Sequence, residues 1–144
     1  MNTMFTRLAI GLAAIMLAGL FGPSPVAAAD QQQAIKRTIF QKSDVPGTNY
    51  ETVFGMAEIA PNTDFASHTH PGTESSYVIE GGITLNVKGQ PTREVKIGEA
   101  IFVPAGVPHS GRAGPNGAKI VAAWVVEKGK PLASPAEPFT AEAK

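Results

Sequence analysis

The residues of this chain best suited to chemistry are its histidines, of which there are only three in 144 residues. His68 and His70 lie one residue apart in the segment HTHPGTE, which ends at Glu74, and His109 ends the segment VPAGVPH. Side chains of a strand alternate between its two faces, so imidazoles at positions i and i+2 point to the same side. Because no histidine is placed elsewhere, we expect the three to act together.

A divalent transition-metal ion is the ligand that this group predicts. Neutral imidazole binds such cations well, and a carboxylate adds a negative charge. The turn PGT can return Glu74 to the face of His68 and His70, and the turn PAGVP can bring His109 beside them. We therefore predict one metal ion per chain, held by these four residues. The absence of cysteine excludes thiolate ligands and leaves Fe, Mn, Co, Ni, Cu and Zn as candidates.

The segments around these residues resemble the two sequence motifs of the cupin family. HTHPGTESSYVIEG (68–81) has the spacing of the first motif, and GEAIFVPAGVPH (98–109) has that of the second. Asn62 stands where the first motif opens with glycine, and Ala113 stands where the second ends with asparagine. Asparagine tolerates a positive φ, so the turn at residue 62 can survive the change.

The resemblance implies an all-β fold, the double-stranded β-helix or jelly-roll barrel. It also implies a metal held inside the barrel near one mouth and frequent dimerisation through strands at the barrel edge. The ligands that it implies are His68, His70, Glu74 and His109. A zinc hydratase site, in which an HxH pair and a distant histidine hold zinc, fits this chain less well. The hydratase pattern has neither the glutamate nor the PxGxxH turn that this chain contains.

Short strands are the elements that must position these residues. Ile83, Leu85 and Val87 alternate with polar residues, which is typical of a half-buried strand. The run 118–127 is apolar on both faces and is expected to lie in the interior. No long helical period follows residue 30, so the pattern predicts a sandwich or barrel. The expected strands are 34–41, 50–60, 64–70, 75–80, 83–88, 93–97, 100–103 and 118–127.

Three regions are expected along the chain. Residues 1–29 have a positive n-region, an apolar run and small residues before a cleavage point, as in a signal peptide. We therefore expect a periplasmic or secreted protein with no stable membrane anchor after signal removal; an uncleaved anchor would need about 20 apolar residues. Residues 30–127 would form the β-barrel domain. Residues 128–144 are Pro-rich and predict an extended or partly disordered arm, with Phe139 as its anchor.

Charge and cysteine content narrow the partners. Lysine and arginine number 12, aspartate and glutamate also number 12, and no basic stripe is present, which argues against nucleic-acid binding. Without cysteine the core must hold the domain without disulfides. The expected partners are a small-molecule ligand or substrate and a second copy of the chain.

Few residues remain as catalytic candidates once the histidines are ligands. Glu74 could detach from the metal and act as a base. Arg112 follows His109 by three residues and could orient an anionic substrate, although a solvated rim arginine is the simpler interpretation. Tyr77 has odd parity relative to Glu74, so it is expected to point away from the metal.

Three functions fit these features. The first is a dioxygenase-like oxidoreductase acting on a small organic substrate, since four protein ligands leave two adjacent positions of an octahedral sphere open. The second is a metal-dependent isomerase, epimerase or decarboxylase. The third is a non-catalytic protein that binds a metal or a small ligand. The fold hosts all three, so the resemblance does not choose among them.

Overall fold

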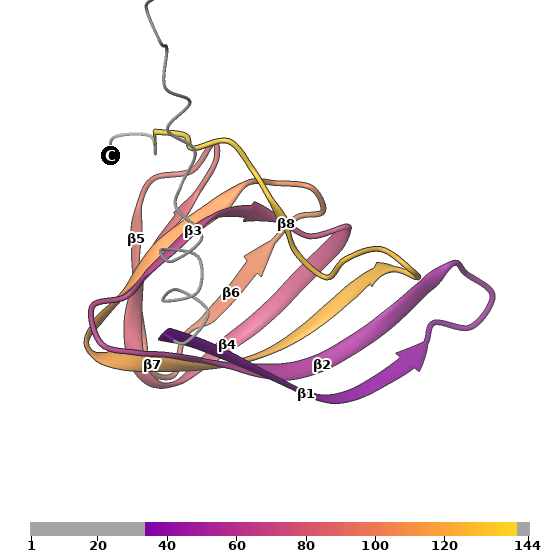
Figure 1. Ribbon diagram of the computed structural model, residues 1–144, viewed down its shortest axis with the longest axis horizontal. Helices are drawn as coiled ribbons and strands as arrows, with labels where there is room; N and C mark the ends of the chain where they lie inside the picture. Colours follow the sequence, from indigo (N-terminus) through magenta and orange to yellow (C-terminus); the bar gives the residue numbers. More distant parts are fainter. Residues whose placement is uncertain (1–33, 141–144) are drawn as a thin grey trace, which may run out of the picture.

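The computed structural model describes residues 34–140, and the signal-peptide prediction for residues 1–29 lies outside this range (Figure 1). The described part consists of eight β-strands, as the predicted all-β class requires. Within these residues, no helix has the length and apolarity needed to cross a membrane. The strands are β1 (Ile35–Asp44), β2 (Tyr50–Ile59), β3 (Asp64–Thr69), β4 (Gly72–Val87), β5 (Arg93–Lys96), β6 (Ala100–Val103), β7 (His109–Glu127) and β8 (Ser134–Pro135).

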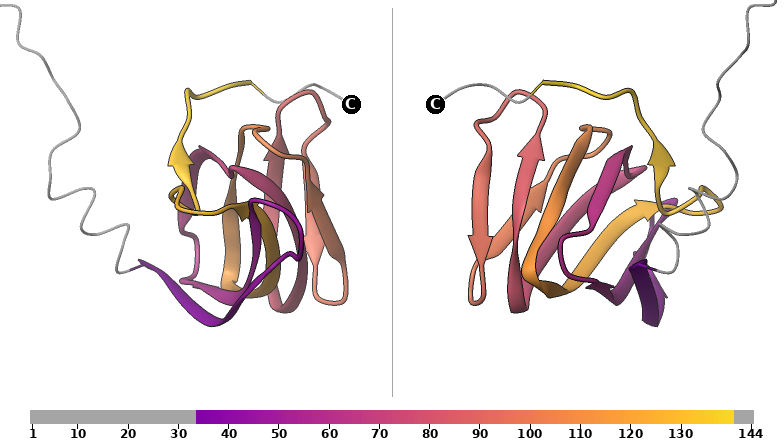
Figure 2. Two further views of the ribbon diagram at one scale, coloured as in Figure 1. Left: turned by 90° about the vertical axis from the view of Figure 1, so that its right-hand side faces the viewer. Right: turned by 60° about the vertical axis from the view of Figure 1, so that its left-hand side comes forward.

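The strands form a sandwich of two layers, and two long antiparallel strands, β4 and β7, contribute to both layers. The second half of β7 lies between β2 and the first half of β4, which also pairs with β6. The first half of β7 lies between β3 and the second half of β4, which also pairs with β5. Each long strand thus passes from one layer into the other (Figure 2). The result is a jelly-roll sandwich whose sheet is not closed into a complete barrel.

The strand boundaries correct two predictions. The segments 75–80 and 83–88 belong to a single strand, β4, and β7 begins at His109 rather than at residue 118. Pairing between β4 and β7 continues past Gly81 and Gly82 with shifts of register, so no turn separates the two halves of either strand. Gly81 has a φ of 65°, and a Cβ there would collide with the Gly117 carbonyl oxygen. These glycines therefore bend the paired strands and do not end them.

The core lies between the layers and confirms the alternating pattern. Ile83, Leu85 and Val87 are 2, 6 and 4% exposed. The expectation that 118–127 is buried on both faces is wrong, because Val125 is 37% exposed on the outer side of the sheet. The strand is central within its layer, but nothing in the described chain covers its outer face. A second apolar cluster contains Val53, Ala122, Trp124 and Val126.

The turn at Asn62 and the C-terminal arm frame the edge where β3 lies. Asn62 adopts a φ of 56°, as expected for asparagine in the place of a glycine, and its N–H donates to the Gly114 carbonyl at 3.0 Å. Beyond β7 the chain crosses the sandwich and pairs with β3 through β8 (Figure 1). Leu132 of this arm packs against the second apolar cluster, while Phe139 is half-buried.

Candidate metal centre

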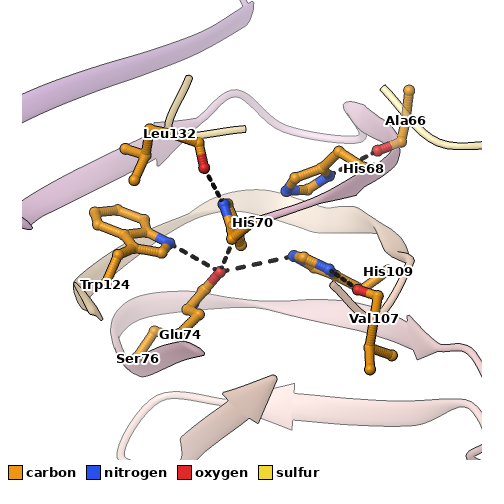
Figure 3. Close-up of polar contacts among 9 residues, drawn as sticks. All are labelled: Ala66, His68, His70, Glu74, Ser76, Val107, His109, Trp124 and Leu132. Atoms are coloured by element: carbon orange, nitrogen blue, oxygen red, sulfur yellow. Dashed lines mark hydrogen bonds and ion pairs between the residues drawn. The ribbon is translucent and has the colours of Figure 1, made fainter. Parts of the chain in front are cut away.

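The three histidines and Glu74 meet at one place inside the sandwich, although they come from three strands (Figure 3). His68 is in β3, and His70 follows directly after Thr69, the last residue of that strand. His109 begins β7 and lies opposite His68 in the register of the two strands. The ring centroids of His68 and His109 are 4.1 Å apart, and each of the other two pairs is 5.0 Å apart. One ring nitrogen of each histidine lies within 4.8 Å of the others.

The turn that precedes His109 is tied to the end of β3. The N–H of Val107 donates to the Pro104 carbonyl at 3.3 Å, and the N–H of Gly106 donates to the His70 carbonyl at 3.0 Å. Gly106 has a φ of 70°, which favours glycine at this position. The PAGVPH segment therefore delivers His109 to the other two histidines through backbone contacts.

Each imidazole places its Nδ1 against a backbone carbonyl oxygen. The pairs are His68 with Ala66 at 2.9 Å, His70 with Leu132 at 2.6 Å and His109 with Val107 at 3.1 Å. A carbonyl only accepts hydrogen bonds, so each Nδ1 carries a proton and donates it. In the neutral ring, Nε2 then keeps its lone pair free for another partner. Such Nδ1 contacts are typical of histidines that bind metals, because they fix both tautomer and ring orientation.

Glu74 directs its carboxylate at the histidines and not at solvent. Its Oε2 lies 2.8 Å from Nε2 of His70 and 3.6 Å from Nε2 of His109, and its side chain is 14% exposed. Nε1 of Trp124 donates to Oε2 at 3.1 Å, and Oγ of Ser76 donates to Oε1 at 2.9 Å. Both oxygens are thus held in place by neighbouring side chains.

The contact between His70 and Glu74 tests whether these residues fit a metal ion. Nε2 of His70 is buried and has no hydrogen-bond partner among the described residues, although Oε2 of Glu74 is close by. Because Nδ1 already donates to Leu132, a neutral His70 and the carboxylate face each other with lone pairs. That arrangement is repulsive unless a cation lies beside both groups or the ring takes a second proton. A divalent cation satisfies both groups, so the donor set fits.

Burial and neighbouring charges bias these groups toward the forms that bind metals. Burial, followed by the adjacent His109, lowers the pKa of His68 from 6.5 to about 4, so this ring is neutral at neutral pH. Burial raises the pKa of Glu74, but the contacts with His109 and His70 outweigh it and hold that pKa below its usual range. A neutral imidazole and an ionised carboxylate are the states that coordinate a cation.

The structure gives different answers for the two catalytic candidates. Glu74 is at the centre, but a carboxylate with a lowered pKa and two fixed oxygens is suited to be a ligand rather than a base. Arg112 does not line the cavity at the centre; it is about half exposed and pairs with Asp64 at 2.6 Å. Arg112 is therefore a solvated arginine at the rim, and its side chain does not reach the cavity. Tyr77 points outward and is 46% exposed, as its parity predicted.

Three residues that support the centre were not identified from the sequence. Ser76 could have been found from its parity, because it lies two residues after Glu74 on the same strand. Trp124 belongs to the apolar run 118–127, and its position opposite Glu74 depends on the register between β4 and β7. The contribution of Leu132 is a backbone carbonyl, which no side-chain pattern predicts.

The centre opens into a small, mostly apolar cavity of about 60 Å³. Its polar side chains are the three histidines, Glu74 and Arg37. Its apolar wall comes from Ile35, Ala57, Ile59, Phe65, Ile83, Leu85, Ile101, Val103, Ile120, Ala122 and Trp124. This volume is well below the ~300 Å³ at the lower end of ordinary ligand pockets. Only a few atoms of a substrate can therefore lie beside the centre.

Fold and centre together define a small jelly-roll protein with three histidines and one glutamate at its inner face. A family model described as the cupin domain matches residues 55–126, which is half of the chain. The chain belongs to the cupin family, and the family and fold expected from the two motifs are confirmed.

Several characterised proteins are similar to this chain. The dimethylsulfoniopropionate lyase DddW of Ruegeria pomeroyi is 31% identical over 67 residues, which are 46% of this chain and 43% of that protein. The crystal structure of the DMSP lyase DddQ from the same species matches with a TM-score of 0.65 at 18% identity, over 74% of this chain and 54% of that one. The polyketide cyclase RemF of Streptomyces resistomycificus matches with a TM-score of 0.54 at 29% identity, over 68 and 69% of the two chains. The chain thus spans about half the length of the two lyases.

Proposed function

We propose that this protein binds one divalent transition-metal ion through His68, His70, Glu74 and His109, and that it is a metal-dependent enzyme. The observation that carries the proposal is the arrangement of the three imidazoles. Each donates from Nδ1 to a carbonyl and leaves Nε2 without a proton, and Nε2 of His70 and of His109 lie 2.8 and 3.6 Å from the carboxylate of Glu74. With neutral rings this arrangement faces lone pairs toward each other, and a divalent cation beside them removes the repulsion without requiring protonation of a ring.

A metal ion held at this centre supplies a Lewis acid that polarises an oxygen of a bound substrate. The remaining work belongs to the chain itself. Trp124 and Ser76 hold the carboxylate of Glu74 in one orientation. The mostly apolar wall lowers the local polarity of the cavity, which strengthens electrostatic interactions inside it.

Among reaction classes, we favour a non-oxidative lyase acting on a small organic molecule. The support is the local similarity to DddW, which is named as a dimethylsulfoniopropionate lyase and exceeds 30% identity over the matched residues. This replaces the dioxygenase-like reaction as first choice. An oxidoreductase is the second candidate, because a set of imidazoles and one carboxylate also suits redox-active metals such as iron and manganese.

Metal binding is tested first, with the purified full-length protein. Stripped protein titrated with Co(II) should bind one equivalent and develop visible absorption bands. The His68→Ala variant should bind at least 100-fold more weakly. As a matched control, Ser110→Ala alters the residue after His109 without removing an imidazole and should bind as wild type does. Equal affinity of the His68→Ala variant and wild type would contradict histidine ligation.

The reaction class is tested next, with protein loaded in turn with Fe(II), Mn(II), Co(II), Ni(II), Cu(II) and Zn(II). Small sulfonium, hydroxy- and dicarbonyl acids are supplied with and without oxygen, and products and oxygen uptake are both measured. Turnover that proceeds without oxygen supports the lyase. Oxygen uptake that disappears in the His68→Ala variant supports the oxidoreductase, and metal binding with no turnover supports a binding protein.

A further inference from the structure

Arg37 is a cationic residue at the mouth of the cavity that the sequence motifs do not include. It is in β1, two residues after Ile35, whose side chain packs against the core. Residues two apart on a strand share a face, so Arg37 lies on the same face as Ile35; its side chain is exposed and lines the mouth of the cavity that contains the three histidines. Its partner across the β1–β2 pairing, Ala57, lines this cavity as well.

The guanidinium of Arg37 is available to a ligand. Within residues 34–140 it takes part in no ion pair or side-chain hydrogen bond, whereas the other two arginines of this range are engaged. Arg112 pairs with Asp64, and Arg93 donates to the Ala100 carbonyl, each at 2.6 Å. A guanidinium beside an apolar cavity, with no carboxylate of its own, favours an anion.

A groove of about 330 Å³ leads from the outside to this point. Its inner end shares Ile35, Arg37, Phe65 and His68 with the cavity. The other wall comes from β3 and the C-terminal arm: Ala66, Ser67, Ala133, Ser134 and Pro135. Among residues 34–140, no acidic residue lines the groove, so a negatively charged group there meets a cation and no competing carboxylate of these residues.

We propose that Arg37 binds a carboxylate of the substrate, so that this site takes small organic acids that enter between β1 and the arm. The proposal rests on the metal-dependent function proposed above. The planar fork of the guanidinium matches both oxygens of a carboxylate. The cavity has room only for the reacting end of the molecule, while the carboxylate stays in the wider groove beside Arg37. Arg37, and not Arg112, is therefore the arginine that orients the substrate.

The test titrates Co(II)-loaded, full-length protein with malonate, which carries a second carboxylate, and follows heat and the cobalt spectrum. Arg37→Met should weaken malonate binding about tenfold, the lower end expected for a hydrogen bond to a charged group at an exposed site. Arg37→Lys keeps the positive charge but not the planar fork, so its malonate affinity should lie between those of Arg37→Met and wild type. Malonamide, the uncharged analogue, should bind weakly to all three.

Lys36→Met is the matched control. It removes one positive charge from the neighbouring residue, which is exposed on the opposite face and pairs with Glu58 at 3.5 Å. Its malonate affinity should stay within twofold of wild type, and both variants should keep their Co(II) affinity and fold. Equal malonate affinities of Arg37→Met and Lys36→Met, or phosphate binding as strong as malonate binding, would overturn the carboxylate role.

The same titrations separate this inference from the metal proposal. Wild-type protein that binds no Co(II) overturns the metal centre. If its metal-free form still binds malonate in a manner that depends on Arg37, the arginine site is supported on its own. Protein that binds Co(II) but not malonate overturns the inference and leaves the metal centre standing.

Discussion

The inner face of β4 and β7 is mostly apolar but contains one polar cluster, whereas the outer face exposes large apolar side chains. On the inner face, Glu74 and Ser76 are at least partly buried together with Trp124, and all are joined by hydrogen bonds. On the outer face, Tyr77 and Val125 are 46 and 37% exposed. Alternation along two paired strands thus places one polar cluster within an apolar interior, and large apolar side chains on part of the exterior.

Each face contains groups that are energetically unfavourable where they lie. A buried carboxylate is unfavourable unless every oxygen has a partner, and an apolar patch on the surface favours association. The inner face offsets its cost through fixed hydrogen bonds, including three from imidazoles to backbone carbonyls. No described residue covers the outer face in the same way. The comparison shows that the buried polar cluster is fixed by hydrogen bonds, whereas the apolar side chains of the outer face have no such compensation among the described residues.

Among variants that leave all four proposed ligands in place, the largest effect on Co(II) affinity is expected from removing the donor that orients Glu74. Trp124→Phe keeps the aromatic packing but removes the Nε1 hydrogen bond to Oε2. Groups that orient metal ligands typically contribute about 10- to 100-fold in affinity, so Co(II) binding should weaken by at least tenfold. Ser76→Ala, which removes the donor to the other oxygen, provides the comparison. Unchanged Co(II) affinity in Trp124→Phe would show that the inner face does not depend on this contact.

The next effect is a dependence of metal-free stability on pH. Unfolded His68 takes up a proton near pH 6.5, whereas the folded residue does so only near pH 4. Between these values the unfolded state binds more protons, so the free energy of unfolding falls as the pH falls from 6.5 to 4. Allowing for partial exposure, the contribution of His68 is about 2 kcal/mol. Urea titrations with a chelator should show this loss in wild type and a smaller one in His68→Gln; equal slopes would contradict the burial effect.

A smaller effect is expected from loosening the arm that holds His70. Leu132 is partly buried against Val53, Trp124 and Val126, and its carbonyl accepts the hydrogen bond of His70. Leu132→Ala should lower the free energy of unfolding by about 1–2 kcal/mol, less than for a fully buried leucine. It should also weaken Co(II) binding, although no ligand is altered. Pro131→Ala, at the exposed neighbouring position, is the control; a loss of stability without any loss of Co(II) affinity would separate the arm from the centre.

Sequence reasoning went furthest where local pattern decides the outcome. The alternation of Ile83, Leu85 and Val87 predicted an inward face, and the spacing of the histidines anticipated their convergence. The sequence did not predict contacts that depend on the pairing register of distant strands or on backbone groups. That Trp124 lies opposite Glu74 follows from long-range pairing. Arg37 was not identified, because nothing in its local sequence shows that β1 borders the cavity. These contacts join segments far apart in the chain, and a local pattern carries no information about them.

The smallest effect on monomer stability is expected on the outer face, where the homodimer predicted from the family resemblance can be tested. Phe102 is 59% exposed and borders an outer groove of about 630 Å³ together with Phe54 and Tyr77. Phe102→Ser should change the free energy of unfolding of the monomer by less than about 0.5 kcal/mol, since little of the ring is buried. If two copies associate through this face, sedimentation should instead show a clear shift from dimer to monomer. Ile97→Ser, equally exposed but outside the groove, should leave the oligomeric state unchanged. Wild-type protein that stays monomeric at all concentrations tested would contradict self-association through this face.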